Sequence, residues 1–354
     1  MSETVISITS AGGNRFSGVA GSLLLIAVLA APAARSGQDQ SPPPVPLDAD
    51  AAAAAVEFSR ELERRQQAIE QLQSELGLYD PALVEMYDDL ARVYQEYGDL
   101  DQALAMYREA LQLTRISAGL NSEEQLPYID KLINSSLAIG DWQQADDMHQ
   151  LRYYLKNRLY EPADPRYAAA VAELGDWKLR TMRENLLNEG YRGIGQEAEE
   201  LSDIYQKSIA RIQASPDFSE KSLLPLYRGK SRADLETARV LASTPYQFFE
   251  GTVSRFVYQT VCNNVSDGQG GVVRQCTNVR RENPRYRDSQ RDNKRMMVYR
   301  SVREVEVSLQ SLDAILARNP DIPAAERERL ASEIRELQTE FLAIQRSTRR
   351  SLLY

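Results

Sequence analysis

An internal repeat with a period of 42 residues restricts this chain of 354 residues to a small set of architectures. Leu90, Leu132 and Leu174 are separated by this interval, and the dipeptide Gly98-Asp99 recurs as Gly140-Asp141. A fixed period of this size is typical of a solenoid, in which each unit buries its apolar face against its neighbours. The sequence therefore predicts stacked supersecondary units in the first half of the chain.

Each unit is predicted to be a helix, a tight turn and a second helix. In the first unit we expect helices over residues 81–97 and 99–117, with Gly98 at the turn because glycine accepts a left-handed backbone. Apolar residues follow helical spacing in both segments. The two facing stripes are Leu83, Tyr87, Leu90 and Tyr94 on the first helix, and Ala103, Tyr107, Ala110 and Leu111 on the second.

The pattern from Tyr87 to Ala110 resembles a tetratricopeptide repeat, because its aromatic, leucine, small, glycine and alanine positions follow in order. The 42-residue period resembles the long-loop variants of that repeat, and the resemblance extends over about residues 56–214. The second unit departs from the pattern at His149 and Arg152. The third has Met182 at the expected turn, so we expect its first helix to continue. A loop is expected there through Gly190, Gly193 and Gly195, before a helix over residues 196–214.

The resemblance implies a binding surface on the first helices of the units, since ligands of this family lie along that concave face. The residues it places there, as a groove for a protein partner, are Asp88, Arg92, Gln95, Asp130, Asn134, Leu137, Ala172, Asp176 and Leu179. Members that hold a carboxylate tail use lysines, but Asp88 and Asp130 stand at those positions. A neutral or basic segment is therefore the expected ligand.

Residues 248–279 have a different pattern, rich in β-forming residues around the turn sequence 266–271. The chain has two cysteines, Cys262 and Cys276, and their midpoint falls in that turn. Two opposed cysteines would close a β-hairpin that is marginal without a staple. We expect a disulfide between them.

The last segment is predicted to be an antiparallel helical hairpin. Apolar residues alternate at spacings of 4 and 3 from Val298 to Leu316 and again from Leu330 to Ile344, which is the pattern of a coiled-coil seam. The short joint at residues 319–323 favours antiparallel packing. Asp321 is expected to cap the second helix and Pro323 to lie in its first turn.

The N-terminus has the pattern of an export signal. The apolar run at residues 19–31 is shorter than the roughly 20 residues of a spanning helix, and small residues follow it. We predict a signal peptide over residues 1–33; the alternative is an inner-membrane anchor through residues 16–33. A proline-rich linker is expected at residues 34–50. Export to the periplasm agrees with the predicted disulfide.

The formal net charge of −9 argues against a nucleic-acid partner. Residues Arg280–Arg303 are an exception, with nine cations and three acids and hence a local charge of +6. This stretch could contact an anionic envelope surface, or neutralise the acidic body of the same chain or of a second copy in a homo-oligomer.

The sequence offers no motif for catalysis, metal binding or a cofactor. Its single histidine, His149, falls at a core position, and there are too few histidines and thiols for a zinc site. The expected protein is mainly α: a non-catalytic, exported scaffold for protein–protein interaction in a bacterial-type cell envelope. Two alternatives remain open: a self-associating structural coiled-coil protein, and a hydrolase that uses paired carboxylates.

The expected domains follow from these segments. After the signal peptide and linker come a helical repeat domain over residues 51–243, a β-hairpin insert over residues 244–284 and the helical hairpin over residues 285–354.

Overall fold

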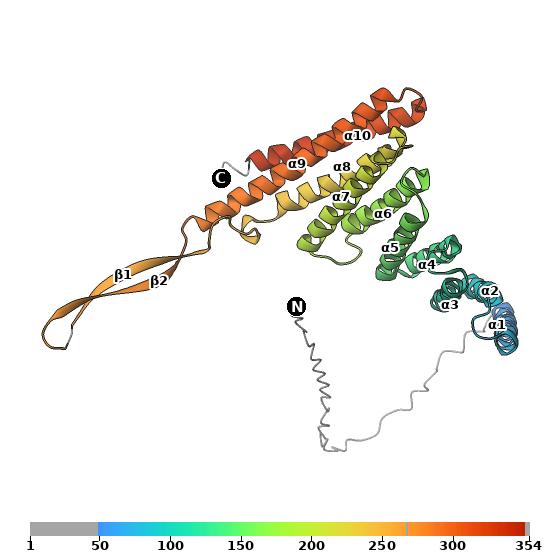
Figure 1. Ribbon diagram of the computed structural model, residues 1–354. Coiled ribbons are helices and arrows are strands. Elements are labelled where there is room, and N and C mark those ends of the chain that lie inside the picture. Colours follow the sequence, from blue (N-terminus) through green and yellow to red (C-terminus); the bar gives the residue numbers. More distant parts are fainter. Residues whose placement is uncertain (1–48, 267, 351–354) are drawn as a thin grey trace, which may run out of the picture. The chain divides into compact units, whose positions relative to one another are not determined.

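A computed structural model describes residues 49–266 and 268–350, within which ten α-helices and one two-stranded sheet follow one another along the chain (Figure 1). The helices of the first part are α1 (Ala49–Leu76), α2 (Ala82–Glu96), α3 (Leu100–Ala118), α4 (Leu126–Ile139), α5 (Trp142–Leu159), α6 (Pro165–Glu184) and α7 (Tyr191–Gln213). The second part contains α8 (Leu224–Ser243), β1 (Phe256–Ser266), β2 (Val272–Glu282), α9 (Tyr286–Arg318) and α10 (Ala324–Arg350). Short 3-10 helices are η1 (Glu123–Gln125), η2 (Glu220–Leu223) and η3 (Tyr246–Phe248).

The predicted signal peptide and almost all of the predicted linker lie outside the described residues. Helix α1 begins at Ala49, inside the end of the predicted linker. The chain divides into two units, Met1–Ala52 and Ala53–Tyr354, and the second holds the fold described below. None of the helices at residues 49–350 is long and apolar enough to span a membrane.

The helices pair as the 42-residue repeat predicts, because the same turn closes the first two units. Gly98 and Gly140 adopt positive φ angles of 83° and 76°. The next amide bonds back into the preceding helix, from Asp99 N to Tyr94 O and from Asp141 N to Ser136 O, both at 2.9 Å. The Asp99 and Asp141 side chains then cap α3 and α5 by accepting from amides three residues on. The Gly-Asp dipeptide thus ends one helix and starts the next.

The core of the first units confirms the predicted facing stripes. Ala103 and Ala110 are fully buried, which lets α2 and α3 approach closely around the ring of Tyr107. Phe58 of α1 stacks on Tyr97 with ring centroids 4.0 Å apart, so α1 packs on the first unit as the second helix of a preceding one would.

In the third unit, the first helix departs from the repeat as expected. The loop that follows it differs from the prediction. Helix α6 continues past Met182 to Glu184, and the cap residue Asn185 takes the left-handed conformation that glycine takes in the earlier units. The loop is shorter than predicted, since α7 begins at Tyr191 and includes Gly193 and Gly195. A Cβ at Gly195 would lie 3.0 Å from Val240, so this glycine lets α7 pack closely on α8.

Helices α6, α7 and α8 meet around Tyr205, one of the largest fully buried side chains. A Cβ at either Gly175 of α6 or Gly229 of α8 would overlap the Tyr205 ring and hydroxyl. The two glycines therefore leave the space that this tyrosine fills. One hydrophobic core extends from here through α9 and α10, so the C-terminal helices are packed on the last repeat unit.

The predicted C-terminal helical hairpin is present as α9 and α10. Its seam residues Leu309, Leu312, Ile334 and Leu337 are buried in the core shared with α7 and α8. Self-association through this seam would have to expose them. Asp321 does not cap α10 as expected; it pairs with Lys221, and Arg327 closes the joint by donating to the Asn319 carbonyl at 2.8 Å.

The β-hairpin has the predicted register and disulfide. Strands β1 and β2 are antiparallel, Cys262 is opposite Cys276, and the two form a disulfide. Among the described residues the sheet has these two strands only, and almost every side chain on both faces is exposed. Because its side chains are exposed, the hairpin is stabilised by its disulfide and by the hydrogen bonds between its strands, and not by packing against a core.

The Tyr205 site makes a testable prediction about stability. Gly175→Ala should lower the free energy of unfolding by about 1–3 kcal/mol, because the added methyl group overlaps the Tyr205 hydroxyl and overpacks the core. The loss should be smaller in a Tyr205→Phe background, which removes that hydroxyl. Urea denaturation of the four proteins measures this coupling.

Gly190→Ala is the matched control. Gly190 precedes α7 with φ −74°, and a Cβ added there would meet no other atom within 4 Å, so alanine should have little effect. Equal losses for Gly175→Ala and Gly190→Ala would contradict the proposed role of the glycine gap.

Candidate partner-binding surface

The residues predicted to form the groove lie on α2, α4 and α6, the first helices of the three units. We call this surface the A-helix face. On α2, the Asp88 carboxylate pairs with Lys131 of α4 and lies 3.7 Å from Arg92 Nε. The predicted acidic residue is thus partly neutralised by a lysine from the next unit.

The same kind of contact continues along the face. Asp130 of α4 accepts from Arg152 of α5 at 2.7 Å, and Arg152 Nε also lies 3.6 Å from Glu173 of α6. Asp176 of α6 accepts from Arg232 of α8 at 3.3 Å. Ion pairs between helices therefore connect successive units, and each predicted aspartate has a cationic neighbour.

The other predicted groove residues are less alike. Gln95 accepts a hydrogen bond from the Tyr107 hydroxyl at 2.9 Å, and Leu137 packs against the core of the first units. Leu179 is buried, whereas Asn134 is exposed. Of the predicted groove residues, Arg92, Gln95, Asn134 and Asp176 are exposed and accessible to a partner.

Sequence reasoning missed a cluster around Tyr128 at the start of α4. Burial, followed by the charges of Asp88, Glu85 and Glu124, raises the pKa of the Tyr128 hydroxyl. The Lys131 ammonium lies 5.3 Å from the Tyr128 ring centroid. These carboxylates come from α2 and η1, two segments far apart in sequence, so the repeat pattern alone gave no signal for them.

A second missed cluster lies behind the face, between α5, α6 and α7. The buried Asp146 carboxylate accepts from Trp177 Nε1 at 2.8 Å and from Lys178 Nζ at 3.0 Å. Lys178 also donates to Glu197 at 2.5 Å. The cluster links the second and third units through one buried cation, which costs desolvation but is paired on both sides.

His149 belongs to this cluster and has the buried place that its position in the repeat predicts. Its ring is stacked on Trp177 with centroids 4.3 Å apart, and its Nδ1 lies 3.0 Å from Arg152 Nη2. Burial, and then the Arg152 charge, lower the pKa of His149 from 6.5 to about 4. The imidazole is therefore neutral at pH 7.

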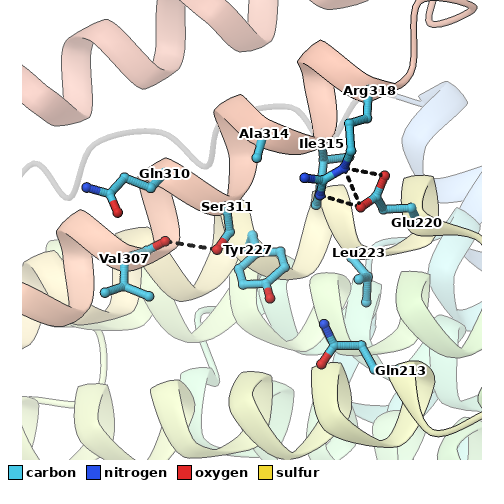
Figure 2. A pocket seen from close by; sticks show the side chains of 10 residues that line it. All are labelled: Gln213, Glu220, Leu223, Tyr227, Val307, Gln310, Ser311, Ala314, Ile315 and Arg318. Carbon is cyan, nitrogen blue, oxygen red and sulfur yellow. Dashed lines mark hydrogen bonds and ion pairs between the residues drawn. The ribbon is translucent and has the colours of Figure 1, made fainter.

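Two surface cavities bear on the hydrolase alternative, which needs two facing carboxylates. The first, of about 310 Å³, lies between α7, α8 and α9, and its carboxylate, Glu220, accepts from Arg318 at 2.9 Å (Figure 2). The second, of about 590 Å³, lies along α3 and α5 and includes Glu109, Asp141 and Asp147. Asp141 already caps α5, and Asp147 accepts from a glutamine four residues before it. Neither set of lining residues contains two carboxylates without such a contact.

The paired helices and the glycine-closed turns define a helical-repeat protein. Residues 62–116 match the tetratricopeptide repeat family model, which covers the end of α1, all of α2 and most of α3. This segment is therefore similar to a tetratricopeptide repeat, as the Tyr87–Ala110 pattern predicted. No curated protein matches the chain in sequence.

Solved structures are similar to this chain only at low identity and low TM-score. TPR-like repeats of a putative kinesin light chain from Podospora anserina are 17% identical to this chain, with a TM-score of 0.35. The similarity covers 52% of this chain and 82% of that chain. BtubC (BKLC) from P. vanneervenii is 17% identical over 55% of this chain and 81% of that chain, with a TM-score of 0.29. A computationally designed self-assembling cyclic homooligomer is 10% identical, with a TM-score of 0.29. The similarity covers 85% of this chain and 99% of that chain.

The pKa of His149 predicts a pH dependence of stability. The folded-state pKa of about 4 lies below the unfolded value, so the unfolded chain binds an extra proton between pH 6.5 and 4. The stability that the folded state gains from keeping His149 neutral is fully present above pH 6.5 and is lost as the pH falls towards 4. The loss should reach at most about 3 kcal/mol.

The variant His149→Phe keeps an aromatic ring against Trp177 and removes the titrating group. Between pH 7 and pH 4 its free energy of unfolding should fall less than that of the wild type, by about 2–3 kcal/mol. Parallel pH profiles for the two proteins would show that His149 does not cause the acid sensitivity.

Proposed function

We propose that this protein is a non-catalytic scaffold that binds a neutral or basic protein segment along its A-helix face. The observation that carries the proposal is the matched repeat segment, whose first helix α2 is joined to α4, and α4 through Arg152 to α6, by ion pairs. Tetratricopeptide repeats bind protein partners, and an extended face made by several units offers more contact area than any single helix pair.

The charge of the face supports this class of ligand. Helix α2 together with η1 and α4 carries seven carboxylates and two cations, and the carboxylates around Tyr128 lie within this set. Lys131 and Arg92 offset part of the excess, but the surface remains acidic over the first two units. A basic segment would complement it, whereas an acidic tail would be repelled.

The ligand class predicts the outcome of a peptide-display selection on the full chain. Selected peptides should be neutral or basic, and their affinity should fall about tenfold in Asp88→Asn/Asp130→Asn, since two carboxylates of the face are lost. Affinities can be measured by isothermal titration calorimetry.

Asp101→Asn/Asp147→Asn provides the control, because it removes the same charge from the second helices α3 and α5. Both aspartates are exposed. If the two double variants bind equally well, or if acidic peptides are selected, the assignment of ligands to the A-helix face is wrong.

We further propose that the protein is exported to the periplasm of a bacterial-type cell envelope. Two observations support this: the signal-like pattern at residues 1–33, and the Cys262–Cys276 disulfide, a bond that persists in oxidising compartments. Stabilising an exposed hairpin by a disulfide would fail in a reducing cytosol.

Export predicts two measurable properties of protein isolated from its natural host. Thiol titration of the unreduced, denatured chain should find no free thiol, and the mature N-terminus should begin near residue 34. Two free thiols together with an intact N-terminus would contradict export.

A further inference from the structure

The β-hairpin and the beginning of α9 form a basic extension that the repeat function does not use. We call residues 255–303 the basic arm. It carries eleven cations and four acids, a net charge of +7, while residues 53–160 carry nineteen acids and ten cations, a net charge of −9. Two regions of opposite charge thus exist in one chain.

Most cations of the basic arm have no ion pair among the residues that the structure describes. Its ion pairs join neighbours inside the arm, namely Arg255–Glu282, Arg291–Asp288 and Arg295–Asp292, all 3.5 Å or longer. Over residues 49–266 and 268–350, no ion pair joins the arm to a carboxylate of α1–α5. The arginines of the arm without an ion pair among these residues are Arg274, Arg280, Arg281, Arg285, Arg287, Arg300 and Arg303.

The base of the arm is fixed, so the arm cannot simply fold back. Gln290 Nε2 donates to the Phe249 carbonyl at 2.8 Å, and Asn293 Nδ2 donates to the Glu250 carbonyl at 2.9 Å. Lys294 donates to the carbonyls of Ala242 and Thr244 at 2.9 and 2.7 Å, at the end of α8. These bonds fasten the first turns of α9 to the segment that enters β1.

The faces of the hairpin favour a protein rather than a bilayer as its partner. At the turn, Ser266, Gly268 and Gly270 are polar or lack a side chain, and Val272, opposite Ser266, is the first exposed apolar residue beyond it (70% exposed). Other exposed apolar residues lie along the strands as far as Tyr258 (74%), opposite Arg280, so the apolar surface is not gathered at the tip, as insertion into a membrane requires. Such a surface suits a mixed polar and apolar protein interface.

We propose that the basic arm binds the acidic A-helix face of a second copy of this chain, next to Glu85 and Glu124. The inference rests on the proposed function, because it uses the same face and names its basic ligand. Each copy would offer one arm and one face, a heterologous contact that closes into a ring or extends as a chain. Because the α9–α10 seam is buried within the chain, the proposed contact does not use that seam.

Sedimentation velocity of the full chain tests the proposal. In about 0.1 M salt, where the Debye length is about 10 Å, we expect species larger than a monomer that grow with concentration. In about 1 M salt, where that length is about 3 Å, association should weaken at least tenfold. A monomer at all concentrations in both salts would overturn the proposal.

A charge exchange gives the sharper test. Arg274→Glu/Arg281→Glu/Arg303→Glu changes three exposed arginines without ion-pair partners among the described residues and should give a folded monomer. Glu85→Lys/Glu124→Lys should also weaken association. Mixing the two variants should restore a complex, because the reversed arm then meets a reversed face.

The matched control is Arg183→Glu/Arg329→Glu/Arg335→Glu, which makes the same charge change at exposed positions outside the arm. It should associate like the wild type. Association that survives in the arm variant, or is lost equally in this control, would overturn the proposal. So would a monomer that binds phosphatidylglycerol vesicles through the arm, since the arm would then be a membrane-binding element.

The outcome also separates this inference from the proposed function. If basic peptides bind the A-helix face while the wild type stays monomeric, only the second-copy partner is wrong. If neither peptides nor the arm bind that face, both proposals fail together.

Discussion

The second half of the structure is organised around the close approach of α6, α7 and α8 at Tyr205. Gly175 and Gly229 leave room for the Tyr205 ring, and no larger residue fits without moving a helix. Packing at native density allows few alternative arrangements. Helices α9 and α10 pack against α8, so the core of the last repeat unit is continuous with the core of the C-terminal helices.

A buried charge reinforces the same junction. Lys230 of α8 donates to Asp234 at 2.8 Å, and Ser308 of α9 donates to Asp234 at 3.4 Å. Burial raises the pKa of Asp234, and the Lys230 charge opposes that rise. Removing one partner would leave the other charge buried and unpaired, which costs far more than the pair contributes. The network thus fixes how α9 lies on α8, and with it the base of the basic arm.

The A-helix face and the basic arm have opposite electrostatic character for different structural reasons. On the A-helix face, carboxylates are distributed over regular helices whose positions the repeat sets, and cations from other helices pair with several of them. In the basic arm, an exposed hairpin and the start of a helix hold arginines that lack such partners among the described residues. The proposed protein ligand and the proposed contact with a second copy would both use this complementarity of charge.

The local elements of this protein could be predicted from its residues alone. The Gly98-Asp99 and Gly140-Asp141 turns, the Tyr107 core position and the Cys262–Cys276 register each depend on neighbouring residues or a simple period, so a pattern was enough to predict them. The pattern did not reveal that Gly193 and Gly195 lie inside α7, or that Tyr205 fills a gap between two glycines. It also did not provide Lys131, Arg152 and Arg232 as partners of the predicted acidic residues. These contacts join helices far apart in the chain, and tertiary packing selects which of the many possible neighbours meet.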